Sequence, residues 1–171
     1  MCEKCDNLNY QPVNGNMLLD EDEVENGLDL TIDRAAVHYK RFLEELGFDL
    51  RDPNMAETPK RVAKMYLMEL FRGTWEQPPV ITTFEIPEKD RPVGDEMLIS
   101  GPLTVKSTCA HHMMPITGKA WIGLFLGKSP KGLPGLSKYK RVLDWYARRP
   151  QLQEQLTIQV RDHLVKELEI D

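Results

Sequence analysis

The segment Cys109-Ala110-His111-His112 carries the residue types best suited to chemistry in this chain. A cysteine and a histidine in the Cys-x-x-His spacing of Cys109 and His112 can bind one zinc ion from a single tight turn. The adjacent His111 would then point elsewhere, free to transfer protons near the metal. The alternative is a buried cysteine followed by two surface histidines at the end of a strand, and the spacing alone does not decide between the two.

A second candidate site is the basic segment that follows Gly135, which contains Ser137, Lys138 and Arg141. It lies at a predicted loop-to-helix junction, where backbone N–H groups and the helix dipole favour an anion. Lys138 and Arg141 share a helix face and could grip one polyphosphate. For such a cluster taken alone, a solvated basic helix start is the commoner outcome.

A third candidate is Glu154, preceded by Gln153, just after a predicted helix start. A carboxylate at this place is often only a surface residue favoured by the helix dipole. A buried carboxylate could instead accept two hydrogen bonds, from the N1–H and the exocyclic amino group of a guanine, with Gln153 as a helper.

The elements that must position these residues are helices and a pair of long strands. The strands flank the Cys109 to His112 segment, so they are predicted to be antiparallel neighbours. The second strand is apolar on both faces, as expected if one face packs on helices and the other on another subunit. The predicted elements are helices over 31–46, 58–73, 136–149 and from 151 onward, and strands over 80–84, 97–105 and 116–126.

Composition narrows the class of protein. The 171 residues suffice for one domain with a core. A net charge of −5 and a pI near 5.4 argue against nucleic-acid or anionic-membrane partners. No apolar run approaches the roughly 20 residues that span a bilayer, and the N-terminus lacks the apolar core of a secretory signal. The three cysteines have no framework spacing, which suggests a reducing compartment. We therefore expect a cytoplasmic protein.

Residues 1–28 are polar and acidic and are predicted to form a flexible tail. Cys2 and Cys5 have the spacing of half a zinc site or of a redox pair. Two ligands do not close a site and no matching pair follows, which favours an unbound tail.

Taken together, these segments resemble the GTP cyclohydrolase I family. That family has a Cys-Glu-His-His zinc motif, then Gly-Leu-Ser-Lys-x-x-Arg, then Arg-Arg/Pro-Gln-x-Gln-Glu-x-Leu-Thr. Upstream, Thr58 to Met65 also resembles the family's Thr-Pro-x-Arg-Val-Ala helix, and the resemblance covers roughly residues 30–171. In this chain the other three motifs stand, in the same order, at 109–112, 135–141 and 149–157.

The resemblance implies an α+β fold: N-terminal helices followed by a partial tunnelling fold, an antiparallel strand pair plus two helices. It implies a tail over 1–28, a helical region and connection over 29–95, and a catalytic region over 96–171. The implied assembly is a ring-shaped homo-oligomer, usually a decamer. The implied reaction is zinc-dependent hydrolysis of GTP to 7,8-dihydroneopterin triphosphate and formate, which feeds tetrahydrofolate, pterin or deazaguanine synthesis.

Carried over residue by residue, the resemblance implies roles for residues in all four motifs. Cys109 and His112 would ligate Zn²⁺, and His111 would do acid and base work. The implied substrate-binding residues are Arg61, Ser137, Lys138, Arg141, Gln153 and Glu154.

The chain departs from the family pattern at two places. Ala110 replaces a glutamate beside the zinc cysteine, and losing such a neighbour of a metal ligand weakens affinity or rate by about 10–100-fold. The family also continues with two strands carrying a His-x-Cys motif, which supplies a second catalytic histidine and a third zinc ligand. The sequence ends at Asp171 without these strands, so we expect an exposed sheet edge.

Three explanations of that departure remain open. A second polypeptide could supply the strands, the chain could be a truncated product, or it could be a catalytically impaired homologue that binds GTP or regulates. The related nitrile reductase of the queuosine pathway is a further alternative, because 136–140 loosely resembles its lysine-bearing motif. The adjacent histidines and the Gln-x-Gln-Glu segment argue against it.

Overall fold

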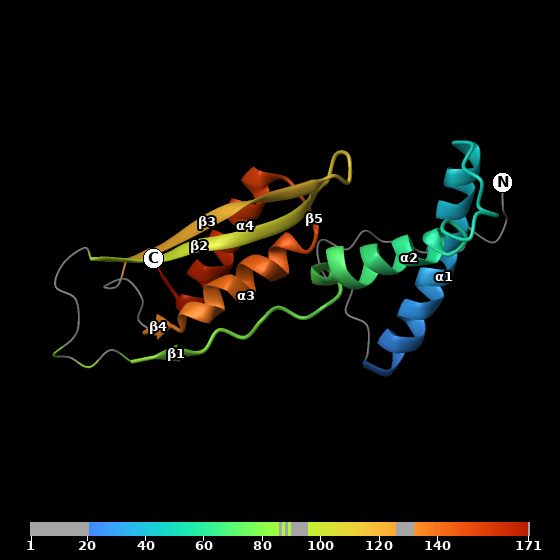
Figure 1. Cartoon of the computed structure of the whole chain (residues 1–171). Helices are drawn as coiled ribbons and strands as arrows, with labels where there is room; N and C mark the ends of the chain where they lie inside the picture. The colour runs from blue at the N-terminus through green and yellow to red at the C-terminus, as the bar shows by residue number, and fades with distance from the viewer. Residues whose placement is uncertain (1–20, 86, 88, 90–95, 126–131, 171) are drawn as a thin grey trace.

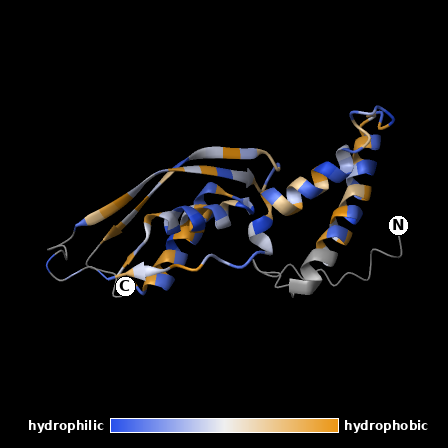
Figure 2. Cartoon of the chain, turned by 60° about the horizontal axis from the view of Figure 1, so that its bottom comes forward, coloured by the Kyte–Doolittle hydropathy of each residue, from blue (hydrophilic) through white to orange (hydrophobic). Residues whose placement is uncertain are grey.

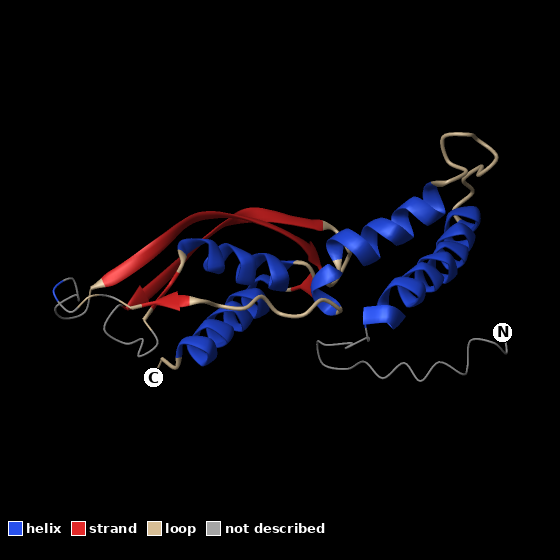
Figure 3. Ribbon diagram, turned by 90° about the horizontal axis from the view of Figure 1, so that it is seen from below, coloured by secondary structure: helices blue, strands red, loops and turns tan. Residues whose placement is uncertain are grey.

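The computed structural model describes residues 21–85, 87, 89, 96–125 and 132–170, and for residues 21–26 the backbone alone. Two helices, α1 and α2, form an arm that stands beside an α/β body (Figure 1). In the body, α3 and α4 lie on the same side of two long strands (Figure 3). The predicted α+β class is therefore confirmed.

Helix α1, Glu21–Glu45, begins earlier than its predicted start at residue 31. Leu28 is buried together with Ile32 and Leu43, so the apolar face extends one turn further toward the N-terminus than expected. Residues 21–28 are thus helical rather than part of a tail, while residues 1–20, with both N-terminal cysteines, lie outside the described residues. Gly47 ends the helix with a φ of +83°, a left-handed conformation that glycine adopts without strain.

Helix α2, Thr58–Met65, packs against α1, and Lys60 forms an ion pair with Asp33 at 2.8 Å. Glu57 occupies the N-cap position of α2 and forms no side-chain cap hydrogen bond. The helix also changes geometry before its predicted end. It continues as a π-helical turn, η1 over Tyr66–Leu70, and then as a 3₁₀ turn, η2 over Arg72–Thr74.

The main sheet has the order β3-β2-β5. Strands β2, Met97–Cys109, and β3, Pro115–Phe125, pair antiparallel as predicted, with a register shift between Ser100 and Leu103. Strand β5, Pro150–Gln151, pairs in parallel with the last residues of β2 and was not predicted. A separate pair joins β1, Thr83–Phe84, to β4, Leu133–Pro134, so only the end of the predicted 80–84 strand forms.

Helices α3, Leu136–Ala147, and α4, Gln153–Leu168, bury their apolar faces between each other and the sheet. Helix α3 stops two residues before its predicted end because Arg148 leaves helical geometry and Pro150 enters β5. The core lies at this three-way contact, and its buried members are Val105, Tyr139, Val142, Leu143, Ala147, Leu156, Val160 and Leu164.

The opposite face of the two long strands is apolar and exposed. Ile99 is 57% exposed and Trp121 is 61% exposed, with Met97 and Phe125 alongside. Figure 2 shows hydrophobic residues on the long strands as well as on the helices that face them. The two-sided apolar character predicted for the second strand is thus confirmed, and its contact with another subunit stays a prediction. None of the helices in the described part of the chain is long and apolar enough to cross a membrane.

Candidate functional site

The segment after Cys109 is a tight turn that joins β2 to β3. The Cys109 N–H donates to the carbonyl of Met114 at 2.7 Å, and the Met113 N–H donates to the carbonyl of Cys109 at 2.9 Å. Met113 closes the turn with a φ of +56°. Cys109 is therefore half-buried at the base of the turn, while His111 and His112 are exposed at its tip.

Strand β5 holds this turn in place. The N–H of Ala110 donates to the carbonyl of Gln151 at 3.0 Å. Gln151 is only 1% exposed, and its side-chain amide donates to the carbonyl of Tyr146 at 2.7 Å and to Oε1 of Gln159 at 2.8 Å. Gln151 thus connects the end of α3 and the middle of α4 through its side-chain amide, and the candidate metal turn through its backbone carbonyl.

The two histidine rings of the turn face different directions. Their centroids lie 6.1 Å apart with an interplanar angle of 74°. A thiolate and an imidazole are ligand types that zinc prefers, so Cys109 and His112 fit that metal in kind. Within the ranges that the structure describes, however, no three His, Cys, Asp or Glu side chains gather closely enough to hold a metal ion. Cys109 and His112 are therefore two candidate ligands, and the described residues do not by themselves complete a coordination shell.

The start of α4 lies at the same end of the body, because β5 leads directly into it. Gln153 and Glu154 are exposed in its first turn. The preceding residue, Leu152, forms no side-chain cap, so the first N–H groups of α4 remain available for an anionic or polar ligand. The structure therefore brings the carboxylate of Glu154 to the same end as the Cys109 turn.

The basic cluster of α3 lies at the other end of that helix. The C-terminal end of α3 is anchored beside β2, where the Ser107 hydroxyl donates to the carbonyl of Ala147 at 2.7 Å. Ser137 lies ten residues before Ala147. Because an α-helix rises by about 1.5 Å per residue, the two residues are about 15 Å apart along the helix axis. Ser137 and Arg141 are exposed, and Lys138 is half-buried. One chain thus does not gather this cluster at the Cys109 turn.

Arg61 is placed apart from both groups. It is exposed on α2, in the helical arm (Figure 1). The candidate substrate residues therefore fall into three places: the first turn of α4 near the candidate metal turn, the N-terminal half of α3, and the arm.

A cavity of about 640 Å³ adjoins the turn, with Thr108 and Pro115 in its wall. Lys106, Lys140 and Arg148 also line it, and Lys140 pairs with Asp144. Lys140 belongs to the 135–141 motif, whereas Lys106 comes from β2 and Arg148 directly follows the end of α3, outside the sequence segments chosen above.

Comparison with known proteins decides which family this arrangement represents. The model of the family described as GTP cyclohydrolase I matches residues 21–171. The chain belongs to the GTP cyclohydrolase I family. The GTP cyclohydrolase 1 of Flavobacterium johnsoniae is 38% identical over 149 residues, which cover 84% of this chain and 64% of that protein.

Two further relatives carry the same name. The GTP cyclohydrolase 1 of Streptomyces coelicolor is 41% identical over 138 residues, or 80% of this chain and 65% of the relative. That of Haemophilus ducreyi is 42% identical over 124 residues, or 72% of this chain and 54% of the relative. The chain therefore spans less than two thirds of the length of each of these proteins.

Within the GTP cyclohydrolase I family, the sequence motifs locate the candidate ligands but not what supports them. Gln151 and Arg149 lie inside the motif quoted above, yet only the structure shows that both are packed supports. Their position in the sequence, between two predicted helices and next to Pro150, could have indicated this supporting role. A helix break at that point must turn the chain inside the body, where polar side chains need partners.

Proposed function

We propose that this chain carries the metal turn and the guanine-binding carboxylate of a zinc-dependent enzyme. It would hydrolyse GTP to 7,8-dihydroneopterin triphosphate and formate. Family membership and the names of the relatives support this proposal. The observation that carries it is the pairing of Cys109 with Gln151, because that pairing sets the candidate metal turn beside the start of α4.

In the proposed site, Cys109 and His112 hold Zn²⁺, which supplies Lewis-acid activation of water near neutral pH. His111, whose ring lies at 74° to that of His112, moves protons to and from the substrate. Glu154 accepts hydrogen bonds from the N1–H and amino group of the guanine, and Gln153 assists it. The exposed first turn of α4 leaves these side chains room to receive the base.

The positions of the candidate triphosphate-binding residues favour a site that is shared between subunits of a homo-oligomer. Ser137, Lys138 and Arg141 lie at the far end of α3 from the turn, and Arg61 lies on the arm. One chain therefore presents its candidate residues in three separate places, and a neighbouring copy would bring its cations to the turn of the next. The exposed apolar face around Ile99 and Trp121 also suits burial in such an assembly.

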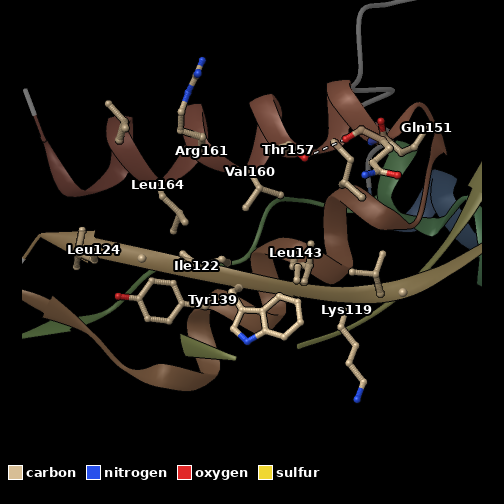
Figure 4. A pocket seen from close by; sticks show the side chains of 18 of the residues that line it. Lys119, Ile122, Leu124, Tyr139, Leu143, Gln151, Thr157, Val160, Arg161 and Leu164 are labelled. Carbon is tan, nitrogen blue, oxygen red and sulfur yellow. Dashed lines mark hydrogen bonds between the residues drawn. The ribbon is translucent and has the colours of Figure 1, made fainter. Parts of the chain in front are cut away.

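A groove of about 600 Å³ lies between β3 and α4. It could bind a further partner, which we propose is an extended segment that bears the His-x-Cys motif. Ile122 and Leu124 on the β3 side face Val160 and Leu164 on the α4 side (Figure 4). In the described part of the chain β3 pairs only with β2, so its other edge can accept a strand through backbone hydrogen bonds. We propose that this segment, continuous with the chain or from a second polypeptide, completes the metal site.

A test of the proposed function is incubation of the protein with GTP and zinc, with and without an added polypeptide that carries the His-x-Cys strands. We expect stoichiometric zinc and release of formate when the strands are present, together with a fluorescent neopterin product after oxidation and dephosphorylation. Cys109→Ser should abolish both zinc binding and turnover. Absence of formate with zinc and the strands supplied would refute the enzyme proposal.

Ala110 and the incomplete metal shell favour one alternative, a non-catalytic GTP-binding or regulatory homologue. For that protein we expect GTP binding with sub-stoichiometric zinc and no formate under every condition. Calorimetric titration with GTP, run beside the formate assay, separates the two proposals.

A further inference from the structure

The arm joins the body at a small junction where η2 meets the end of α3. The Gly73 N–H donates to the carbonyl of Arg148 at 2.9 Å. In return, Nε of Arg149 donates to the carbonyl of Gly73 at 2.8 Å. Nearby, Nε1 of Trp145 donates to the carbonyl of Glu76 at 2.9 Å. Gly73 is therefore bonded on both sides by consecutive residues of the body.

The guanidinium of Arg149 is packed into this junction rather than left in water. Its Cζ lies 3.9 Å from the ring centroid of Trp145 and 4.9 Å from that of Tyr146. Nη2 is buried and has no partner among the described residues, and burial lowers the pKa of Arg149 from its ordinary value. Burying a charged group without full hydrogen bonding is costly, so its contact with Gly73 and the rings must offset that cost.

Gly73 allows the two backbones to touch. A Cβ atom at this position would lie 2.0 Å from the carbonyl oxygen of Trp145 and 2.9 Å from that of Arg148. Both obstacles are backbone atoms, which cannot move aside as a flexible side chain would. The junction is therefore a direct backbone contact without an intervening side chain.

Helical segments connect the junction to Arg61. Residues 58–74 run through α2, η1 and η2 with few interruptions, and Nε1 of Trp75 braces the π-helical turn by donating to the carbonyl of Leu67 at 3.0 Å. A small rotation at Gly73 is therefore carried over roughly 15–20 Å to Arg61.

We propose that Arg149 is a positioning residue that locks the arm onto the body and so sets the place of Arg61 relative to the Cys109 turn. Arg149 directly precedes β5, the strand that pairs with Cys109, so a single side chain links the arm to the candidate metal turn. The role given to Arg61 rests on the proposed function, whereas the lock itself does not.

Hydrogen exchange of the amides in residues 66–77 tests the lock without reference to activity. Arg149→Gln removes the charge and the rigid fork, and we expect exchange at Gly73 to become about 10- to 100-fold faster. The milder Arg149→Lys should give an intermediate rate. Arg148→Gln is the matched control, because Arg148 contributes only its backbone carbonyl to the junction, and its exchange should equal that of the wild type. Wild-type exchange in Arg149→Gln would overturn the proposal.

Gly73→Ala disrupts the same junction from the arm, because the added Cβ atom would overlap the carbonyl oxygen of Trp145. We expect fast exchange over 66–77 in this variant, and wild-type exchange in Gly118→Ala, whose added Cβ meets nothing within 4 Å. Circular dichroism checks that each variant is folded. If Arg149→Gln does not fold, Arg149→Lys and Gly73→Ala carry the test.

Titration with GTP tests the functional half of the proposal. Arg61→Ala and Arg149→Gln should each weaken GTP binding, with zinc content unchanged. Because Arg149 is proposed to act through Arg61, the double variant should bind GTP no more weakly than Arg61→Ala alone. Additive losses would refute positioning. Absence of GTP binding in the wild type would refute the proposed function, while the exchange experiment would still decide the lock.

Discussion

Replacing Gln151 with glutamate should destabilise the packing that supports the candidate metal turn, and so lower the free energy of unfolding. The side chain is 1% exposed, and its amide donates to Tyr146 and to Gln159. Gln151→Glu keeps the shape of the side chain, but an ionised carboxylate has no N–H to donate. It would face two oxygen acceptors in a buried place.

The size of the effect follows from the two lost hydrogen bonds and from the unpaired charge. Each neutral hydrogen bond contributes about 1 kcal/mol, and an unpaired buried charge adds several kcal/mol more. We expect the free energy of unfolding to fall by about 3–5 kcal/mol near neutral pH. For a chain of this size, each kcal/mol lowers Tm by about 2–4 °C.

The loss should depend on pH in a defined direction. Burial and the facing oxygens disfavour the charged form, so the pKa of the new carboxyl should rise above its ordinary value of about 4.3. The destabilisation is therefore greatest above that raised pKa. It shrinks as the pH falls, because the protonated carboxyl is neutral and can donate one hydrogen bond.

Urea unfolding followed by circular dichroism, at neutral and mildly acidic pH, measures this difference between variant and wild type. Gln155→Glu is the matched control, because Gln155 is exposed in the first turn of α4. Its free energy of unfolding should stay within about 0.5 kcal/mol of the wild type. If Gln151→Glu unfolds like the wild type at neutral pH, the buried amide does not support the turn as argued.

Three other substitutions test separate parts of the structure. Tyr139→Phe removes a buried hydroxyl without a partner among the described residues, so thermal melting should show a Tm equal to or slightly above that of the wild type. Val142→Ala, at a fully buried position, should reduce the free energy of unfolding by about 2–3 kcal/mol, against less than about 1 kcal/mol for the partly exposed Val165→Ala. Burial lowers the pKa of His163 below 6.5. The unfolded chain therefore takes up the proton first, and stability should fall as the pH drops below 6.5 toward the folded-state pKa. Urea unfolding across that range should show the loss in the wild type and a smaller one in His163→Gln.

Regular elements were predictable where the apolar period is long. The antiparallel pairing of β2 and β3 and the course of α4 follow from their alternation and helical spacing. Strand β5 was not predictable, because a two-residue parallel strand leaves no periodic pattern and depends on α3 returning beside β2. The early start of α1 was not predicted, because the acidic residues around position 21 are typical of a tail. Leu28, which is buried, belongs to the apolar face of the helix.

The residue types of the candidate site are visible in the sequence alone. The Cys-x-x-His turn, the adjacent His111 and the carboxylate of Glu154 are local patterns, because a tight turn and a helix start are built by neighbouring residues. Their order along the chain was also sufficient to indicate the family.

How those parts are held, and which of them meet, depends on contacts between elements that are distant in the sequence. The bond from Arg149 to Gly73 joins residues 76 positions apart, and the turn at Cys109 is bonded to the backbone of Gln151 in β5. The tertiary structure also places Lys138, Arg141 and Arg61 away from the Cys109 turn of their own chain. Contacts of this kind arise from the packing of separate elements, which no single segment of sequence encodes.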